Sequence, residues 1–73
     1  MQVSGRIVAV QEQRFRFAAD SGQILLLTLG RHAPLDAAAL VAFKHSQAHL
    51  QVDFSGEPNL SGGVAHNLRE VGR

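Results

Sequence analysis

Arginine side chains are the first candidates for chemistry in this sequence. Arg14 and Arg16 alternate with Phe15 and Phe17. In an extended strand such alternation sends the two kinds of side chain to opposite faces, and burying two unpaired guanidinium groups would be very costly. We therefore expect the phenylalanines in the core and both arginines in solvent, where they can meet phosphates.

Other cations extend this pair into a candidate basic patch. Arg6 lies on a neighbouring expected strand, and Arg31 and His32 would stand at one end. The candidate nucleic-acid-binding residues are Arg6, Arg14, Arg16, Arg31 and His32. The alternative interpretation is a set of solvated side chains, some of them paired with Glu12 or Asp20, because exposed arginines are the ordinary case.

The histidines do not form a recognisable set of metal ligands. His45 and His49 are four residues apart, but the helix around them should end near Lys44, and His49 and His66 fall on different strands. Cysteine is absent, and no carboxylate stands at ligand spacing beside them. We expect neither a metal site nor a cofactor.

Catalysis is not expected either. Ser46, His45 and Asp53 supply the residue types of a catalytic triad, but the sequence lacks a nucleophile elbow and an oxyanion loop. The Gly62-Gly63 pair does not lead from a strand into a helix, so it is not a phosphate-binding loop. The chain is interpreted as non-enzymatic.

Length and composition limit the class of protein. The 73 residues form a single domain, 1–73, and 45% of them are hydrophobic, enough for a small core. The N-terminus lacks the pattern of a secretion signal, and the longest apolar run, residues 24–29, is too short to span a membrane. We therefore expect a cytoplasmic protein without membrane contact. The net charge of +1 is only slightly basic for a nucleic-acid-binding protein.

Residues 34–44 contain the one segment with a clear helical pattern. Asp36 stands at the N-cap position before three alanines, and Leu35 and Leu40 are spaced as a hydrophobic staple. Lys44 suits the negative end of the helix dipole. A helix of about two turns is not stable alone in water, so it must pack against the rest of the chain.

Strand-like segments lie on both sides of this helix. The turn at residues 20–22 would pair Ala19 with Gln23, which places Phe17 opposite Leu25. The segment that begins at Gln23 is apolar on both faces, so a helix, another strand or a partner must cover part of it. The expected strands span residues 2–10, 14–19, 23–29, 47–54 and 64–71.

Two of these strands carry more particular expectations. Gly5 is interpreted as a bend or bulge that lets the first strand serve two sheets. In the last strand we expect Val64, Ala65, Leu68 and Val71 to point inward.

This order of strands and helix resembles the oligonucleotide/oligosaccharide-binding fold, the OB-fold, over residues 2–71. The resemblance implies a mainly β protein, a five-stranded OB-like Greek-key barrel with one short helix between the third and fourth strands. An SH3-like barrel does not normally carry a capped helix at this place. The resemblance also implies a binding surface on strands two and three and the nearby loops: Arg14, Arg16, Leu26, Thr28 and residues 11–13 and 55–63.

Two functions follow from this interpretation. The first is weak binding of single-stranded DNA or RNA through the Arg14 and Arg16 face. The sequence departs from the nucleic-acid-binding pattern because it has no Trp or Tyr to stack on bases, and its four phenylalanines are expected in the core. The alternative is a protein-interaction or homodimerising barrel that docks a partner or a second copy through the third strand.

Overall fold

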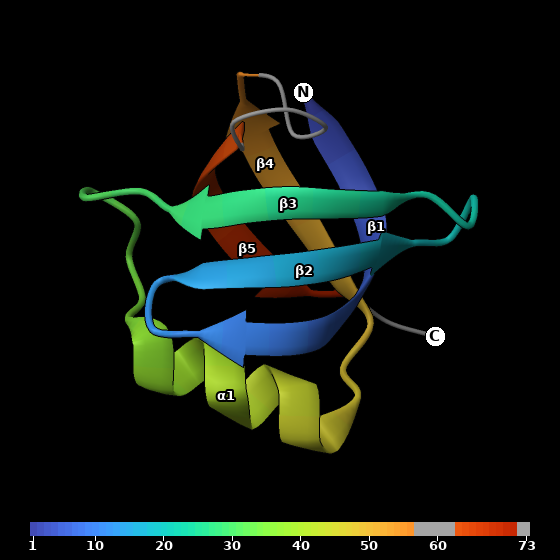
Figure 1. The fold of residues 1–73 in the computed structure, drawn as a ribbon, viewed down its shortest axis with the longest axis horizontal. Helices are drawn as coiled ribbons and strands as arrows, with labels where there is room; N and C mark the ends of the chain where they lie inside the picture. Colours follow the sequence, from blue (N-terminus) through green and yellow to red (C-terminus); the bar gives the residue numbers. More distant parts are fainter. Residues whose placement is uncertain (57–62, 72–73) are drawn as a thin grey trace.

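The chain forms a mainly β structure with one helix between its third and fourth strands, as the sequence predicts. A computed structural model describes residues 1–56 and 63–71. The elements are β1 (Gln2–Gln11), β2 (Arg14–Ala19), β3 (Ile24–Leu29), α1 (Ala37–Ser46), β4 (Leu50–Ser55) and β5 (Gly63–Glu70). The strands close into one barrel in the order β1-β2-β3-β5-β4 (Figure 1).

Strand β1 belongs to both halves of the barrel. Its first residues pair with β4 and its later residues pair with β2, and Gly5 takes part in both registers. A Cβ at Gly5 would lie 2.0 Å from the Ala18 carbonyl oxygen, so only glycine fits this crossing. Gly5 thus serves both β2 and β4, as expected of a bend there, but it is not a bulge. The register with β2 shifts between Ile7 and Ala9 instead, which leaves Val8 unpaired in this ladder.

The β2–β3 hairpin has the predicted register. The Ala19 amide donates to the Gln23 carbonyl oxygen at 2.8 Å, and Gly22 adopts a φ of 97° in the turn. Phe17 therefore pairs with Leu25, and both side chains are buried. The predicted inward phenylalanines of β2 are confirmed.

Strand β5 joins the two halves of the barrel. Its residues 63–65 pair in parallel with residues 27–29 of β3, and its residues 64–70 pair antiparallel with residues 50–55 of β4. The β4–β5 register shifts between Asp53 and Phe54, and Val64 points outward with 40% of its surface exposed. The prediction that Val64 points inward is wrong, because Gly63 and Ala65 occupy the inward positions on either side of it.

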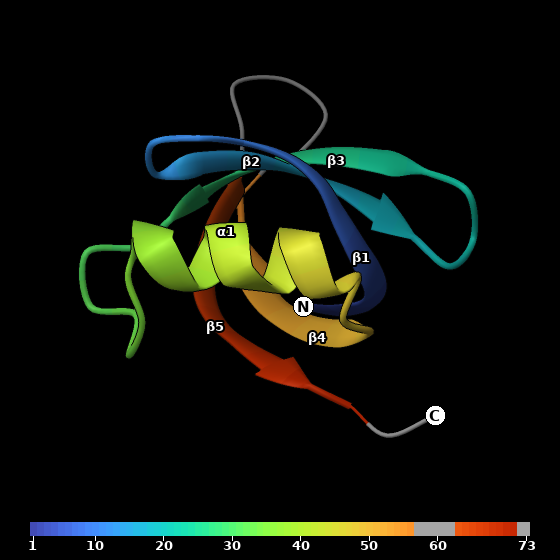
Figure 2. The same cartoon turned by 90° about the horizontal axis from the view of Figure 1, so that it is seen from below.

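Helix α1 lies across one end of the barrel (Figures 1 and 2). The Asp36 carboxylate caps it by accepting from the Ala39 amide at 3.1 Å. The helix extends two residues beyond Lys44, to Ser46, and ends where Gln47 takes a left-handed conformation. The helix buries the side chain of Leu40 completely in the barrel. It therefore stabilises the barrel by covering one end with apolar surface.

The core fills the interior of the barrel with aliphatic and phenylalanine side chains. No polar or charged side chain is buried among the residues that the structure describes. Phe43, expected in the core, is only partly buried and packs at its margin. The buried cluster consists of Ile7, Phe15, Phe17, Leu25, Leu27, Leu29, Leu40, Ala48, Leu50, Val52, Phe54, Ala65 and Leu68.

Candidate functional site

The outer surface of β1, β2 and β3 carries the predicted arginines. Strand pairing places Arg14 between Gln11 and Thr28, and Arg16 between Ala9 and Leu26. This curved three-stranded sheet forms one side of the barrel (Figure 1). We call its outward side chains the arginine face: Arg6, Val8, Ala9, Gln11, Arg14, Arg16, Ala18, Ile24, Leu26 and Thr28.

Arg14 and Arg16 are exposed, and their guanidinium groups have no hydrogen bond or ion pair within residues 1–56 and 63–71. Neither arginine pairs with Glu12 or Asp20 in the described part of the chain, and Asp20 bonds His49 at 2.8 Å. Solvated arginine side chains, the main part of the alternative interpretation, agree with this exposure equally well. Two positive groups, two positions apart on one strand, are therefore open to an external anion.

Arg6 differs from these two arginines. Its Nε donates to the Gln47 carbonyl oxygen at 3.3 Å, at the C-terminal end of α1. The positive charge there matches the negative end of the helix dipole. Arg6 thus fastens β1 to the helix and has fewer free donors than Arg14 or Arg16.

Exposed aliphatic side chains lie among these arginines. Val8, Ile24 and Leu26 have 48%, 50% and 40% of their surface exposed. Leu26 is the direct cross-strand neighbour of Arg16. The arginine face therefore offers positive charge and apolar surface side by side.

An open hollow borders this face at the β1–β2 turn. It has a volume of about 510 Å³, and the described residues that line it are Glu12, Gln13, Arg14 and Thr28. The Gln13 carbonyl oxygen accepts from the Leu29 amide at 2.7 Å, which ties the turn to the end of β3. The walls of the hollow are thus held by strand pairing and by this backbone bond.

Arg31 and His32 lie in the link between β3 and α1, and both are exposed. Both views place this link at the same end of the molecule as the β1–β2 turn (Figures 1 and 2). Arg31 and His32 are therefore not on the strands that form the arginine face. Of the long loop expected to border the face, residues 57–62 lie outside the described residues.

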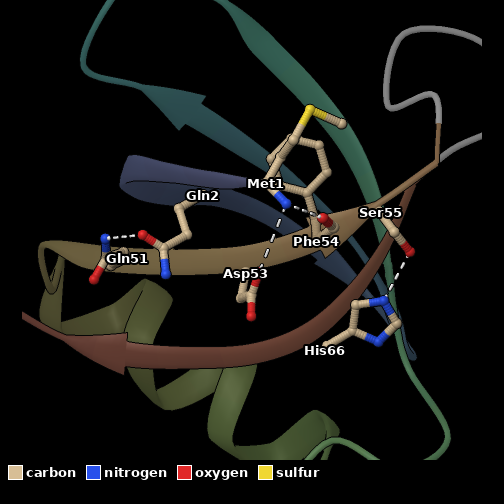
Figure 3. Close-up of polar contacts among 7 residues, drawn as sticks. All are labelled: Met1, Gln2, Gln51, Asp53, Phe54, Ser55 and His66. Carbon is tan, nitrogen blue, oxygen red and sulfur yellow. Dashed lines mark hydrogen bonds and ion pairs between the residues drawn. The ribbon is translucent and has the colours of Figure 1, made fainter.

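The opposite side of the barrel has a different outer surface. On β1, β4 and β5 the polar side chains bond one another. Gln51 donates from its Nε2 to the Oε1 of Gln2 at 3.0 Å, and the Ser55 Oγ and His66 Nε2 atoms form a hydrogen bond of 2.7 Å (Figure 3). Arg69 donates from its Nε to the Gln51 side chain at 3.1 Å. These side-chain hydrogen bonds were not predicted from the sequence, because each of them joins residues on two different strands.

The N-terminal ammonium group belongs to the same side. It donates to the Phe54 carbonyl oxygen at 2.9 Å and lies 3.8 Å from the Asp53 carboxylate (Figure 3). Asp53 therefore contacts the N-terminus and not Ser46 or His45, the other two residues considered for a catalytic triad. Ser46, for its part, donates to the Phe43 carbonyl oxygen at 3.2 Å.

Potential metal ligands stay separate in the described part of the chain, where no group of three or more histidine and carboxylate side chains gathers. Within residues 1–56 and 63–71, no helix combines the length and apolar character that a bilayer span requires.

Comparison of the chain with protein-family models, curated proteins and solved structures found no match.

Proposed function

We propose that this protein is a small non-enzymatic binding module that holds single-stranded nucleic acid on the arginine face. The observation that carries the proposal is the pair of guanidinium groups at Arg14 and Arg16, which have no partner within residues 1–56 and 63–71 and lie beside the exposed side chain of Leu26. A single strand presents phosphates and apolar base faces together, and this face has a group for each.

The barrel topology supports the same proposal. A five-stranded barrel with a helix between its third and fourth strands is compatible with an OB-like barrel. In that fold the β2–β3 face and the neighbouring loops are the usual oligonucleotide-binding surface. Arg14 and Arg16 lie on β2, and the hollow lies beside Arg14 and Thr28 of β2 and β3.

Binding should be weak and sensitive to salt. Few positive groups are available, so few counterions leave the nucleic acid on binding. All four phenylalanines are buried or partly buried, so base faces would meet aliphatic side chains and not aromatic rings.

A second copy is a less suitable partner for this face. The exposed Ile24 and Leu26 favour some apolar contact, which is the observation behind a homodimer through β3. Two copies packed face to face, however, would bring the Arg14 and Arg16 charges of each toward those of the other. The arginine face has no carboxylate to offset them, so an anionic partner fits better.

The test is titration with a short single-stranded oligonucleotide at low salt, followed by backbone amide shifts and by anisotropy of a labelled strand. Shifts are expected at Arg14, Arg16 and the β1–β2 turn. The double substitution Arg14→Gln and Arg16→Gln should remove most binding. Any residual binding should depend less steeply on salt, by about 1.4 in the log–log slope for two lost phosphate contacts on a single strand.

Arg69→Gln is the matched control for charge, because Arg69 lies on the opposite side of the barrel. It should leave both the amide shifts and the salt slope nearly unchanged. Binding that survives the double substitution, or that falls equally in the control, would show that the arginine face is not the site. A concentration-dependent dimer in sedimentation that Leu26→Lys abolishes would favour the homodimer instead.

A further inference from the structure

The hollow beside the arginine face has walls of mixed hydrogen-bonding character. The Glu12 carboxylate only accepts, the Arg14 guanidinium only donates, and the Gln13 amide and Thr28 hydroxyl do both. None of these four side chains has a hydrogen bond to another residue in the described part of the chain. The hollow therefore offers both donors and acceptors to a ligand.

The charges of the walls limit what can enter. Glu12 and Arg14 carry opposite charges, so an anion or a cation in the hollow would be attracted by one of them and repelled by the other, and neither sign of charge is favoured. The group that fits is neutral and carries donors on one edge and acceptors on another. A nucleobase meets this requirement, and the hollow, of about 510 Å³, is open to solvent, so a base of a bound strand can reach its walls.

Guanine matches the Glu12 and Arg14 pair better than the other bases do. Its N1–H and N2–H₂ groups are adjacent donors, which suit the two oxygens of a carboxylate. Its O6 and N7 atoms are the acceptors that arginine commonly contacts. In thymine and uracil the single N3–H lies between two carbonyl oxygens, which would repel a carboxylate, and adenine and cytosine lack two adjacent ring-edge donors.

We propose that the hollow holds a guanine base of the bound single strand, with Glu12 selecting it. The inference rests on the proposed function, because the strand itself is held by the arginine face. Arg14 can serve both roles, since its five N–H donors allow contact with a base edge and a neighbouring phosphate. Arg16, one row away from the hollow, contacts the backbone alone.

The experiment compares short strands that differ at one central base. Oligothymidylate is measured with thymine, adenine, hypoxanthine or guanine at that position, by anisotropy at one low salt concentration. The same substitutions in an oligouridylate strand, measured in parallel, show whether the protein prefers DNA or RNA. Guanine is expected to bind about tenfold tighter than thymine. Hypoxanthine should lose most of this gain, because it lacks the 2-amino group.

Two variants assign the preference to Glu12. Glu12→Gln should reduce the guanine preference to less than about threefold while the thymine strand binds at least as well as before. Glu70→Gln removes the same charge from β5, whose residue 70 pairs with β4, and should keep the preference. Circular dichroism checks that both variants remain folded.

Three results would overturn the inference. Equal binding of all four bases in both series refutes guanine selection while the proposed function stands. A guanine preference that persists in Glu12→Gln assigns the selection to other residues. Absence of binding by every strand removes the proposed function and the inference together.

Discussion

At the scale of single residues, Gly5 decides whether the barrel can close. It is paired with Ala19 of β2 and with Leu50 of β4, at the place where β1 passes between the two halves. The backbone of β2 comes so near that a methyl group has no space. The requirement at Gly5 is steric, in contrast to Gly22, whose positive φ is the constraint.

Gly5→Ala should lower the free energy of unfolding by at least roughly 3 kcal/mol, because the new Cβ overlaps backbone that cannot move aside without breaking the β1–β2 pairing. Gly22→Ala is the comparison. Its Cβ would meet no atom within 4 Å, so only the cost of a left-handed alanine, about 1–2 kcal/mol, is expected. Urea denaturation measures both. Equal losses in the two variants would contradict the steric account.

At the scale of elements, the two ends of helix α1 are set by different contacts, one local in sequence and one from a distant strand. The Asp36 cap starts it, and Gln47 ends it with its amide donating to the Lys44 carbonyl oxygen at 3.2 Å. Arg6, from β1, holds the same end through the Gln47 carbonyl oxygen. The helix is thus defined by its own sequence at one end and partly by another strand at the other.

Asp36→Ala should therefore cost about 1 kcal/mol of stability, because the first turn loses its side-chain acceptor. Asp36→Asn should retain nearly all of it, since asparagine caps about as well. The free energy of unfolding in urea, with amide exchange of residues 37–40, gives the measurement. An alanine variant as stable as the parent would mean that packing alone sets the start of the helix.

At the scale of the whole molecule, the barrel has one core and two unlike outer surfaces. On β1, β4 and β5 the polar side chains bond one another, whereas Arg14 and Arg16 on the arginine face bond no other residue that the structure describes. The core beneath both surfaces is continuous. Damage to the core should therefore unfold both surfaces together.

Phe17→Ala should show this cooperativity. Phe17 is fully buried, and truncation of a buried phenylalanine costs about 3–5 kcal/mol, comparable with a total stability on the order of 5 kcal/mol for a domain of this length. The variant should retain at most about 2 kcal/mol, so we expect it to be only marginally stable at room temperature by circular dichroism and proton NMR. Phe43→Ala, at the margin of the core, should stay folded. The reverse order of stability would place the centre of the core near α1.

Local patterns predicted much of this fold. The turn at residues 20–22 set the β2–β3 register, because Gly22 suits the left-handed conformation that the structure shows there. Alternation of Arg14 and Arg16 with Phe15 and Phe17 placed each kind of side chain on the correct face. Asp36 marked the start of α1. Each of these signals acts between residues that are near in the chain.

Long-range pairing decided the rest. The shift in the β4–β5 register places Val64 on the outer surface. The bulge in β1 lies at Val8 and not at Gly5, and β3 pairs in parallel with β5. Arg6 bonds Gln47, 41 residues away. The sequence by itself determined the elements and the inward face of β2 through local sterics and burial. Only the tertiary structure decided which arginines have no partner among the described residues, because that depends on partners from distant strands.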